Sequence, residues 1–316
     1  MNKRVVLQDI ADALHVSKNT VSHALRDLSD ISEPLKEKIK NKAAEMGYIP
    51  NNLSIFLREN KSKLIGIVTC DLINPYYSIQ IDKLIKKVHE QGYLAITILT
   101  NSGYLDFEVF KYLLNYQVGA IISFQDLSQE TYDFIKIRTF PIILYGLISK
   151  FENVPSVYSD DYEGGNIIAQ ECIKLKAKRP CFIAWDTNID TSKRRMQGFI
   201  DELAKSNIKA DIYNVGYVDQ SNYKIIKENQ NDFVFAYCDT LGIQIKDYLK
   251  ANGYDNYTLY GFDGISFYLK SAKTIKSTYA DAEEMSKYTA IEIKKSIENV
   301  NYKIKSKKFK VSLYKY

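Results

Sequence analysis

The sequence has few of the residues from which most enzyme and metal sites are built. Only three of its 316 residues are histidine and four are cysteine. The histidines are His15, His23 and His89. The cysteines are Cys70, Cys172, Cys181 and Cys238, and their wide spacing argues against a zinc site or a disulfide framework. No glycine-rich dinucleotide motif or phosphate loop occurs, so we expect neither an enzyme nor a cofactor.

Long apolar segments are also missing. No run of about eighteen apolar residues is present, which excludes a membrane-spanning helix by the usual length criterion. The amino terminus has no charged segment followed by an apolar core, as an export signal would. We therefore expect a cytoplasmic protein that keeps its thiols reduced and has no membrane partner.

The first fifty residues carry the strongest local pattern. Apolar residues from Leu7 to Leu14 have helical spacing, and Ser17 is placed to cap a second helix after a two-residue joint. A third helix is predicted after Ser32, with Pro34 in its first turn and Gly47 just past its end. Three short helices in this order predict an all-α helix-turn-helix domain.

From Lys63 onward the pattern changes to alternating strands and helices. The predicted strands are Leu64 to Thr69, Leu94 to Leu99, Ala120 to Ser123, Ile142 to Tyr145, Cys181 to Trp185, Phe233 to Tyr237 and Thr258 to Phe262. Amphipathic stretches such as Ile79 to Gln91 separate these strands. This rhythm predicts α/β architecture with two doubly wound, parallel-sheet lobes.

The amino-terminal segment resembles the signature of the lactose-repressor (LacI/GalR) family of bacterial transcription regulators. The resemblance lies in Leu7 to Leu25, which includes Val-Ser-Lys-Asn-Thr-Val-Ser-His, and in Gly-Tyr-Ile-Pro-Asn at 47 to 51. It continues through Asn74 to Tyr77, Arg195 to Phe199, Cys238 to Gly242 and Gly261 to Asp263. The resemblance implies two lobes of periplasmic-binding-protein type and a domain order of 1–49, hinge helix or linker 50–61, and effector domain 62–316.

The resemblance also implies which residues contact DNA. The second helix would enter the major groove with its first residues against base edges, so Lys18, Asn19 and His23 are the base-reading candidates. Ser17, Thr20, Ser22 and Ser32 contact phosphate or, as an equal alternative, cap helices. Tyr48, Asn51 and the hinge residue Leu57, a candidate minor-groove wedge, complete the set. His15 stands where the family usually has glycine, which requires a left-handed backbone.

The effector site is expected between the lobes, beyond the carboxyl ends of the strands. The candidate residues are Tyr76, Tyr77, Ser123, Asp160, Arg195 and Asp239. Charged planar groups and aromatic rings suit a sugar or, nearly as well, a nucleobase. The structural alternatives are a helix cap for Asp239 and a bridge between lobes for Arg195.

Charge and chain length bear on assembly. Residues 1–60 contain nine Lys or Arg and eight Asp or Glu, a weakly basic balance for a DNA-binding module. Useful affinity for DNA then needs two tethered modules, so we expect a homodimer on a palindromic operator. We expect a dimer and not a tetramer because no heptad segment follows the last predicted strand. The helix around Ile79 to Val88 is the expected interface.

The lobe boundaries and two alternative functions complete the interpretation. We assign 62–160 and 281–300 to the first lobe, and 161–280 and 301–316 to the second, with one strand over Phe309 to Leu313. One alternative is a DNA-binding regulator that senses a protein co-regulator instead of a small molecule. A more distant alternative is a solute-binding protein, against which residues 1–60 and the missing export signal both count.

Overall fold

The computed structural model describes residues 5–49, 62–217, 219–267 and 275–314. The chain forms two compact units, Met1–Asn60 and Lys61–Tyr316, and each is described by itself.

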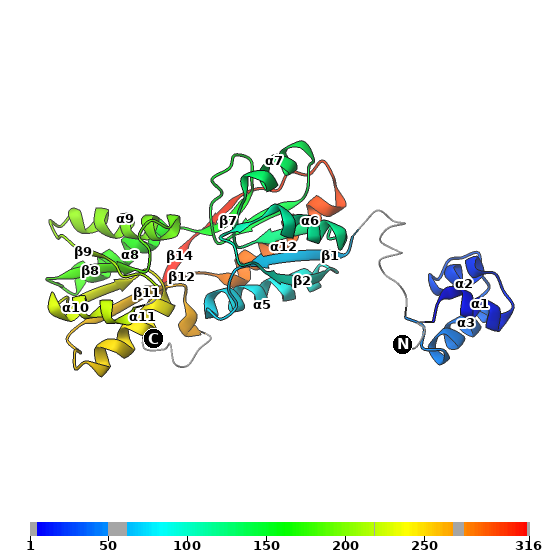
Figure 1. The fold of residues 1–316 in the computed structure, drawn as a ribbon, viewed down its shortest axis with the longest axis horizontal. Helices are drawn as coiled ribbons and strands as arrows, with labels where there is room; N and C mark the ends of the chain where they lie inside the picture. Colours follow the sequence, from blue (N-terminus) through cyan, green and yellow to red (C-terminus); the bar gives the residue numbers. More distant parts are fainter. Residues whose placement is uncertain (1–4, 50–61, 218, 268–274, 315–316) are drawn as a thin grey trace. The chain divides into compact units, whose positions relative to one another are not determined.

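Residues 5–49, the described part of the first unit, form a bundle of three short helices (Figure 1). They are α1 (Leu7–Leu14), α2 (Lys18–Leu25) and α3 (Glu33–Glu45). Their core consists of Ile10, Ala11, Val21, Ala24, Ile39 and Ala43. His15 ends α1 in the left-handed conformation, with φ 54°, as its place in the turn predicts. The predicted helix-turn-helix is therefore confirmed, together with the apolar face that joins its helices.

The second unit begins with a lobe built on a six-stranded parallel sheet, in the order β13-β7-β6-β4-β1-β2. Its strands are β1 (Leu64–Thr69), β2 (Leu94–Leu99), β4 (Ala120–Ser123), β6 (Ile142–Tyr145), β7 (Ser156–Ser159) and β13 (Lys307–Phe309). Its helices are α5 (Pro75–Glu90), α6 (Phe107–Asn115), α7 (Gln129–Ile137) and α12 (Ala282–Glu298). A small ladder pairs β3 (Tyr104–Leu105) with β5 (Asp126–Leu127).

The second lobe has its own six-stranded sheet, in the order β14-β12-β11-β10-β8-β9, in which only the β12–β14 pair is antiparallel. Its strands are β8 (Pro180–Ala184), β9 (Asp211–Asn214), β10 (Phe233–Ala236), β11 (Thr258–Phe262), β12 (Lys276–Ala280) and β14 (Val311–Tyr314). Its helices are α8 (Asp161–Lys174), α9 (Asp190–Ala204), α10 (Lys224–Glu228) and α11 (Asp239–Ala251). Its described residues also form two 3₁₀ turns, η1 (Gln220–Tyr223) and η2 (Ile265–Phe267).

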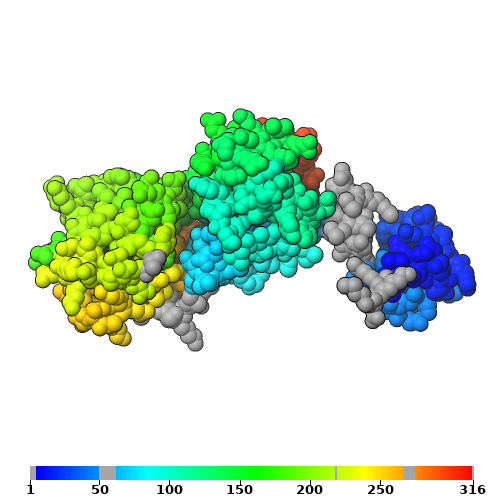
Figure 2. Space-filling view, viewed as in Figure 1, coloured from blue at the N-terminus to red at the C-terminus, as the bar shows by residue number. Residues whose placement is uncertain are grey.

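Helices cover both faces of each sheet, so each lobe contains two apolar layers (Figure 1). In the first lobe α5 and α12 cover one face, and α6 and α7 cover the other. In the second lobe α10 and α11 cover one face, and α8 and α9 cover the other. The two lobes can be told apart by their colours in the space-filling view (Figure 2). This arrangement confirms the predicted two doubly wound parallel-sheet lobes.

The chain crosses between the lobes at three places, each of which is one residue long. Asp160 lies between β7 and α8, Asp281 between β12 and α12, and Lys310 between β13 and β14. The last crossing corrects our expectation of one strand over Phe309 to Leu313 and of a second-lobe assignment for all of 301–316. The alternating pattern runs unbroken through Lys310, so it could not show that β13 joins the first sheet and β14 the second.

Helices α8 and α9 approach each other closely because each presents a glycine to the other. A Cβ on Gly165 would lie 2.1 Å from the carbonyl oxygen of Arg195, and one on Gly198 would lie 2.0 Å from that of Tyr162. Both neighbours are backbone atoms that cannot move aside without shifting a helix. The separation of α8 and α9 therefore depends on these two glycines.

Gly165→Ala is expected to destabilise the second lobe by about 1–3 kcal/mol, because the added methyl group forces α8 and α9 apart. Urea unfolding followed by the fluorescence of Trp185, the only tryptophan of the chain and a second-lobe residue, measures this effect. Gly103→Ala is the matched control, since a Cβ there meets no atom within 4 Å. Equal urea midpoints for the two variants would contradict the proposed contact.

Candidate functional site

The first half of α2 forms the candidate DNA-reading surface of the first unit. Ser17 caps the helix, and its Oγ accepts the Thr20 N–H at 3.0 Å while the two hydroxyls are 2.8 Å apart. Lys18 and Asn19 follow as exposed residues, and Ser22 and His23 are half-buried on the next turn. The buried Val21 and Ala24 hold the opposite face against the core. The cap thereby holds the exposed first turn in place.

The remaining candidates in this unit have structural contacts of their own. His23 Nδ1 lies 2.5 Å from Asp30 Oδ2, which orients the imidazole along the surface. Ser32 begins α3 as its N-cap residue, but its hydroxyl makes no capping hydrogen bond. Tyr48 packs on the three-helix core, and its N–H donates to the Ala43 carbonyl at 2.8 Å. Asn51 and Leu57 lie outside the described residues.

Three of the six Lys and Arg residues in 5–49 form ion pairs, and Arg26 donates instead to the Ser22 carbonyl. Lys36 and Lys42 form ion pairs with Glu33 and Glu45 on α3, and Lys40 contacts Asp27. Among residues 5–49, the lysines without an ion pair are Lys18 and Lys38. The net attraction for phosphate is therefore small, in agreement with the balance of charges in the sequence.

Arg195 on α9 is the centre of the candidate effector site in the second unit. Its side chain is 7% exposed, and its Nε donates to Asp161 Oδ1 at 2.9 Å. Its Nη1 donates to the Tyr237 carbonyl at 2.6 Å and lies 3.4 Å from Asp263 Oδ1. The guanidinium carbon is 3.5 Å from the centroid of the Phe262 ring. Burial by itself lowers the pKa of Arg195, but the Asp161 and Asp263 carboxylates raise it above its usual value.

Asp263 follows β11 and faces Arg195. Its backbone has φ 110°, a conformation that non-glycine residues rarely adopt, and its side chain is 6% exposed. Burial raises the pKa of Asp263 to about 7, against the opposing effect of Arg195, and Asp161 adds repulsion in the same direction as burial. A buried carboxylate with a strained backbone and a raised pKa beside a guanidinium is typical of a ligand-binding site.

The first lobe contributes aromatic residues from the start of α5. Tyr76 and Tyr77 make an edge-on contact, with centroids 5.3 Å apart, and Tyr77 packs edge-on against Phe124 at 5.7 Å. Burial raises the pKa of Tyr76, and the negative charge of Asp263 in the other lobe adds to this effect. Thr240 of the second lobe donates its Oγ1–H to Asn74 Oδ1 at 2.9 Å, which joins the lobes directly.

Three of the predicted effector residues, Ser123, Asp160 and Asp239, make contacts within the protein. Ser123 is fully buried, and its hydroxyl donates to the Gln125 carbonyl at 2.7 Å within a tight turn. Asp160 caps α8 and pairs with Lys308 at 2.5 Å, so it holds a lobe crossing. Asp239 is 1% exposed, and its carboxylate accepts from Ser277 Oγ at 2.7 Å and the Ile265 N–H at 2.8 Å. The helix-cap alternative for Asp239 is wrong, because Cys238 is the N-cap residue of α11 and the Asp239 carboxylate instead joins Ser277 to the backbone of Ile265.

The sequence did not lead us to select Asp161 and Asp263 as candidates, although these are the two carboxylates that form ion pairs with Arg195. Asp263 lies directly after a predicted strand, within the Gly261 to Asp263 landmark, and this placement was a usable signal. The signal for Asp161 was weaker, because adjacent acidic residues at a helix start look alike in a sequence. The aromatic group of Trp185, Tyr217 and Tyr237, with centroids 5.4 and 5.6 Å from that of Trp185, was also overlooked.

Comparison with known proteins identifies the type of protein. The profile for bacterial regulatory proteins of the lacI family matches residues 6–51. The profile for periplasmic binding proteins and the sugar-binding domain of the LacI family matches residues 62–228. The chain belongs to the lacI family. It is accordingly a DNA-binding transcription regulator that carries a domain of the sugar-binding type.

The similarity of the chain to individual proteins supports this identification. The sucrose operon repressor of Lactococcus lactis subsp. lactis is 27% identical over 296 residues, 89% of this chain and 91% of the relative. The transcriptional regulator MalR of Clostridium butyricum is 24% identical over 294 residues, 85% of this chain and 87% of the relative. A lac repressor dimer bound to operator and the anti-inducer ONPF has a TM-score of 0.83 at 18% identity, covering 99% of this chain and 98% of that one, which shows the fold.

Neither a metal-binding cluster nor a membrane-spanning helix is found among the described residues. No group of three or more His, Cys, Asp or Glu side chains in them is arranged to hold a metal ion. Among their helices, none is both long enough and apolar enough to span a membrane.

Asp263→Asn is expected to change how stability depends on pH. The folded state binds a proton on Asp263 more readily than the unfolded state, because its pKa is raised from 3.8 to about 7. The stability contributed by this group is therefore present below pH about 4 and lost as the pH rises through about 7. The difference in unfolding free energy, variant minus parent, should then increase from pH 4 to 7.

Urea titrations between pH 4 and 8, followed by the fluorescence of Trp185, measure this difference. Asp255→Asn, at an exposed position of the same lobe, is the control for the loss of one carboxylate. Parallel profiles for Asp263→Asn and the parent would contradict the assignment of a raised pKa to Asp263.

Proposed function

We propose that this lacI-family regulator is a repressor that binds a palindromic operator as a homodimer, under the control of a sugar or sugar derivative bound between its lobes. The observation that carries the effector half of the proposal is the buried Arg195, which is shared by Asp161 and Asp263 and lies beside the tyrosines of α5. A guanidinium and a carboxylate pair with vicinal hydroxyls, and aromatic rings cover the apolar face of a sugar.

Additional polar groups in the second lobe support this assignment. Three buried hydroxyls, those of Ser192, Ser266 and Thr278, have no hydrogen-bond partner among the described residues. Ser192 precedes Arg195 by one turn of α9, and Thr278 pairs with Phe262 in the sheet. A buried hydroxyl without a partner is costly, so a polar ligand that reached these groups would gain free energy.

The names of the relatives point to the same ligand class. Sucrose operon repressors and a ribose operon repressor occur among the relatives of this chain. Regulators of the same fold have been solved as complexes with cellobiose and with ribose. We infer that a sugar is the first ligand class to test.

The DNA half of the proposal rests on the exposed start of α2. We assign base contacts to Lys18, Asn19 and His23, because the first turn of a recognition helix points at base edges in the major groove. Asn19 suits adenine and Lys18 suits guanine. The pairing of His23 with Asp30 favours a supporting role for Asp30 in orienting the imidazole. Ser17, Thr20, Ser22, Ser32 and Tyr48 remain candidates for phosphate contacts.

The proposed dimer surface includes β2 and α5. Strand β2 is an edge strand of the first sheet, and its Leu94 and Leu99 are 55% and 54% exposed. An edge strand with unpaired backbone groups and exposed leucines is usually covered by another element or by a partner chain. Helix α5, which contains Ile79 to Val88, packs against β2, so the two elements are neighbours in the first lobe.

A thermal-shift screen tests the effector assignment. Sugars and nucleobases are added to the purified protein, and a ligand at 100 times its Kd should stabilise the folded state by about 2.7 kcal/mol. Arg195→Ala and Asp263→Asn should each abolish the shift, while Arg179→Ala on the loop before β8 should retain it. A protein that binds its operator but shifts with no compound would contradict the proposal and favour a protein co-regulator.

Leu94→Lys is expected to shift the homodimer toward monomers, because it places a charge in the proposed apolar interface. Sedimentation equilibrium measures the dimer dissociation, and titration with an operator selected from random DNA measures the affinity, which should fall with it. Leu175→Lys, which changes a leucine of similar exposure in the second lobe, should leave both unchanged. A Leu94→Lys protein that stays dimeric would exclude this surface.

A further inference from the structure

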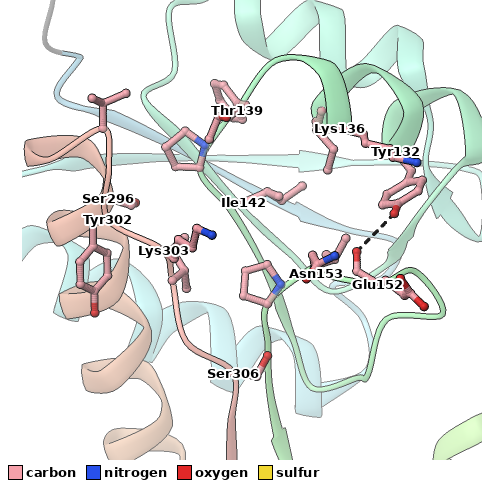
Figure 3. Close-up of a pocket in the computed structure, with 17 residues that line it drawn as sticks. Tyr132, Lys136, Thr139, Ile142, Glu152, Asn153, Ser296, Tyr302, Lys303 and Ser306 are labelled. Carbon is pink, nitrogen blue, oxygen red and sulfur yellow. Dashed lines mark hydrogen bonds between the residues drawn. The ribbon is translucent and has the colours of Figure 1, made fainter.

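The first lobe contains a pocket of about 720 Å³ that the proposed effector site does not use (Figure 3). Its lining includes Ile142 at the start of β6, Pro155 just before β7, and Ser306 just before β13. Since these strands are parallel, the pocket lies at the edge of the sheet where they begin. Phe124 and the effector-site tyrosines lie at the opposite edge, where strands end. The pocket is therefore a separate feature of the lobe.

The pocket has an apolar floor and walls that are held in place. Ile142 and Val154 of the floor are 3% and 8% exposed. Tyr132 forms one wall and stacks on Phe151 with centroids 4.3 Å apart. Its hydroxyl donates to the Glu152 carbonyl at 3.4 Å, the contact drawn in Figure 3. These two contacts position the Tyr132 ring at the side of the pocket.

The segment after α12 forms the facing wall, and a buried carboxylate anchors it. Glu292 on α12 is 2% exposed and accepts from the Tyr302 hydroxyl at 2.9 and 2.8 Å. It also accepts the Lys305 N–H at 3.1 Å. Lys303 lies between these two anchored residues and lines the pocket. The backbone that carries Lys303 is thus held at both sides.

The lining contains two lysines, which come from opposite walls, and one glutamate, and all three residues are exposed. Lys136 comes from α7 and Lys303 from the segment after α12, and neither ammonium has an ion pair or hydrogen bond to a described residue. Glu152 is the acidic side chain of the lining. Unpaired ammonium groups beside an apolar floor favour a ligand that has an anionic end and a compact body.

We propose that this pocket binds a small phosphorylated metabolite, with the phosphate between Lys136 and Lys303 and the body on the Ile142 floor. A phosphate dianion carries two negative charges and so balances two lysine ammonium groups, whereas a single carboxylate balances one. Lysine binds phosphate as a point charge. The volume falls within the range of about 300–1,000 Å³ that is typical of small-molecule sites. The pocket is thus a second ligand site of the regulator, independent of the effector between the lobes.

Isothermal titration of the full-length protein tests this site with glucose 6-phosphate, fructose 1,6-bisphosphate and AMP. Glucose and inorganic phosphate are the matched probes that lack the phosphate or the body. The double variant Lys136→Gln/Lys303→Gln should weaken binding of the responding compound by about tenfold or more for each lysine. Lys174→Gln/Lys224→Gln, which removes the same charge from the second lobe, should leave the affinity as it is.

Each remaining outcome of this titration overturns the assignment. Binding of none of the three compounds at millimolar concentration excludes a phosphorylated metabolite. Equal binding of inorganic phosphate shows that the apolar floor makes no contribution. Affinity that is lost in Arg195→Ala but retained in Lys136→Gln/Lys303→Gln places the ligand between the lobes instead.

Discussion

The ion pair between Arg195 and Asp161 is the interaction on which the organisation of the second lobe depends. Asp161 begins α8, and Gly165 lies one turn later, where α8 contacts the backbone of α9 at Arg195. The absence of a side chain on Gly165 and Gly198 lets the helices come close enough for the 2.9 Å hydrogen bond. A packing requirement and an electrostatic one are therefore satisfied by the same pair of helices.

Burial gives this ion pair its effect on the neighbouring groups. A guanidinium removed from water needs compensation, and Asp161, the Tyr237 carbonyl and the Phe262 ring supply most of it. Asp263 is the second carboxylate beside Arg195, and it is held in a strained backbone conformation. Since Asp161 already occupies the Nε edge, Asp263 is the carboxylate with capacity to accept further hydrogen bonds.

The sequence predicted the fold much better than the site. Capping residues and apolar periodicity are local properties, so Ser17, His15 and the strands β1, β2, β4 and β6 could be located from them. The roles of Ser123 and Asp239 depend on partners that are distant in sequence or set by a turn, and no pattern of residues shows these partners. The exchange of sheets at Lys310 was hidden for the same reason, because strand periodicity carries no information about which neighbour a strand pairs with.

The three one-residue crossings at Asp160, Asp281 and Lys310 have a mechanical consequence. Each crossing is tied to a strand or helix on both sides, and the Asp160 N–H also donates to the Phe309 carbonyl at 2.9 Å. The lobes therefore cannot slide past each other or separate without breaking sheet ladders. A rotation of one lobe relative to the other would have to be carried by the φ and ψ angles of these three residues and would also break the hydrogen bond between Thr240 and Asn74. With such a hinge, small changes of the torsion angles at the crossings would displace the far end of each lobe by a much larger distance.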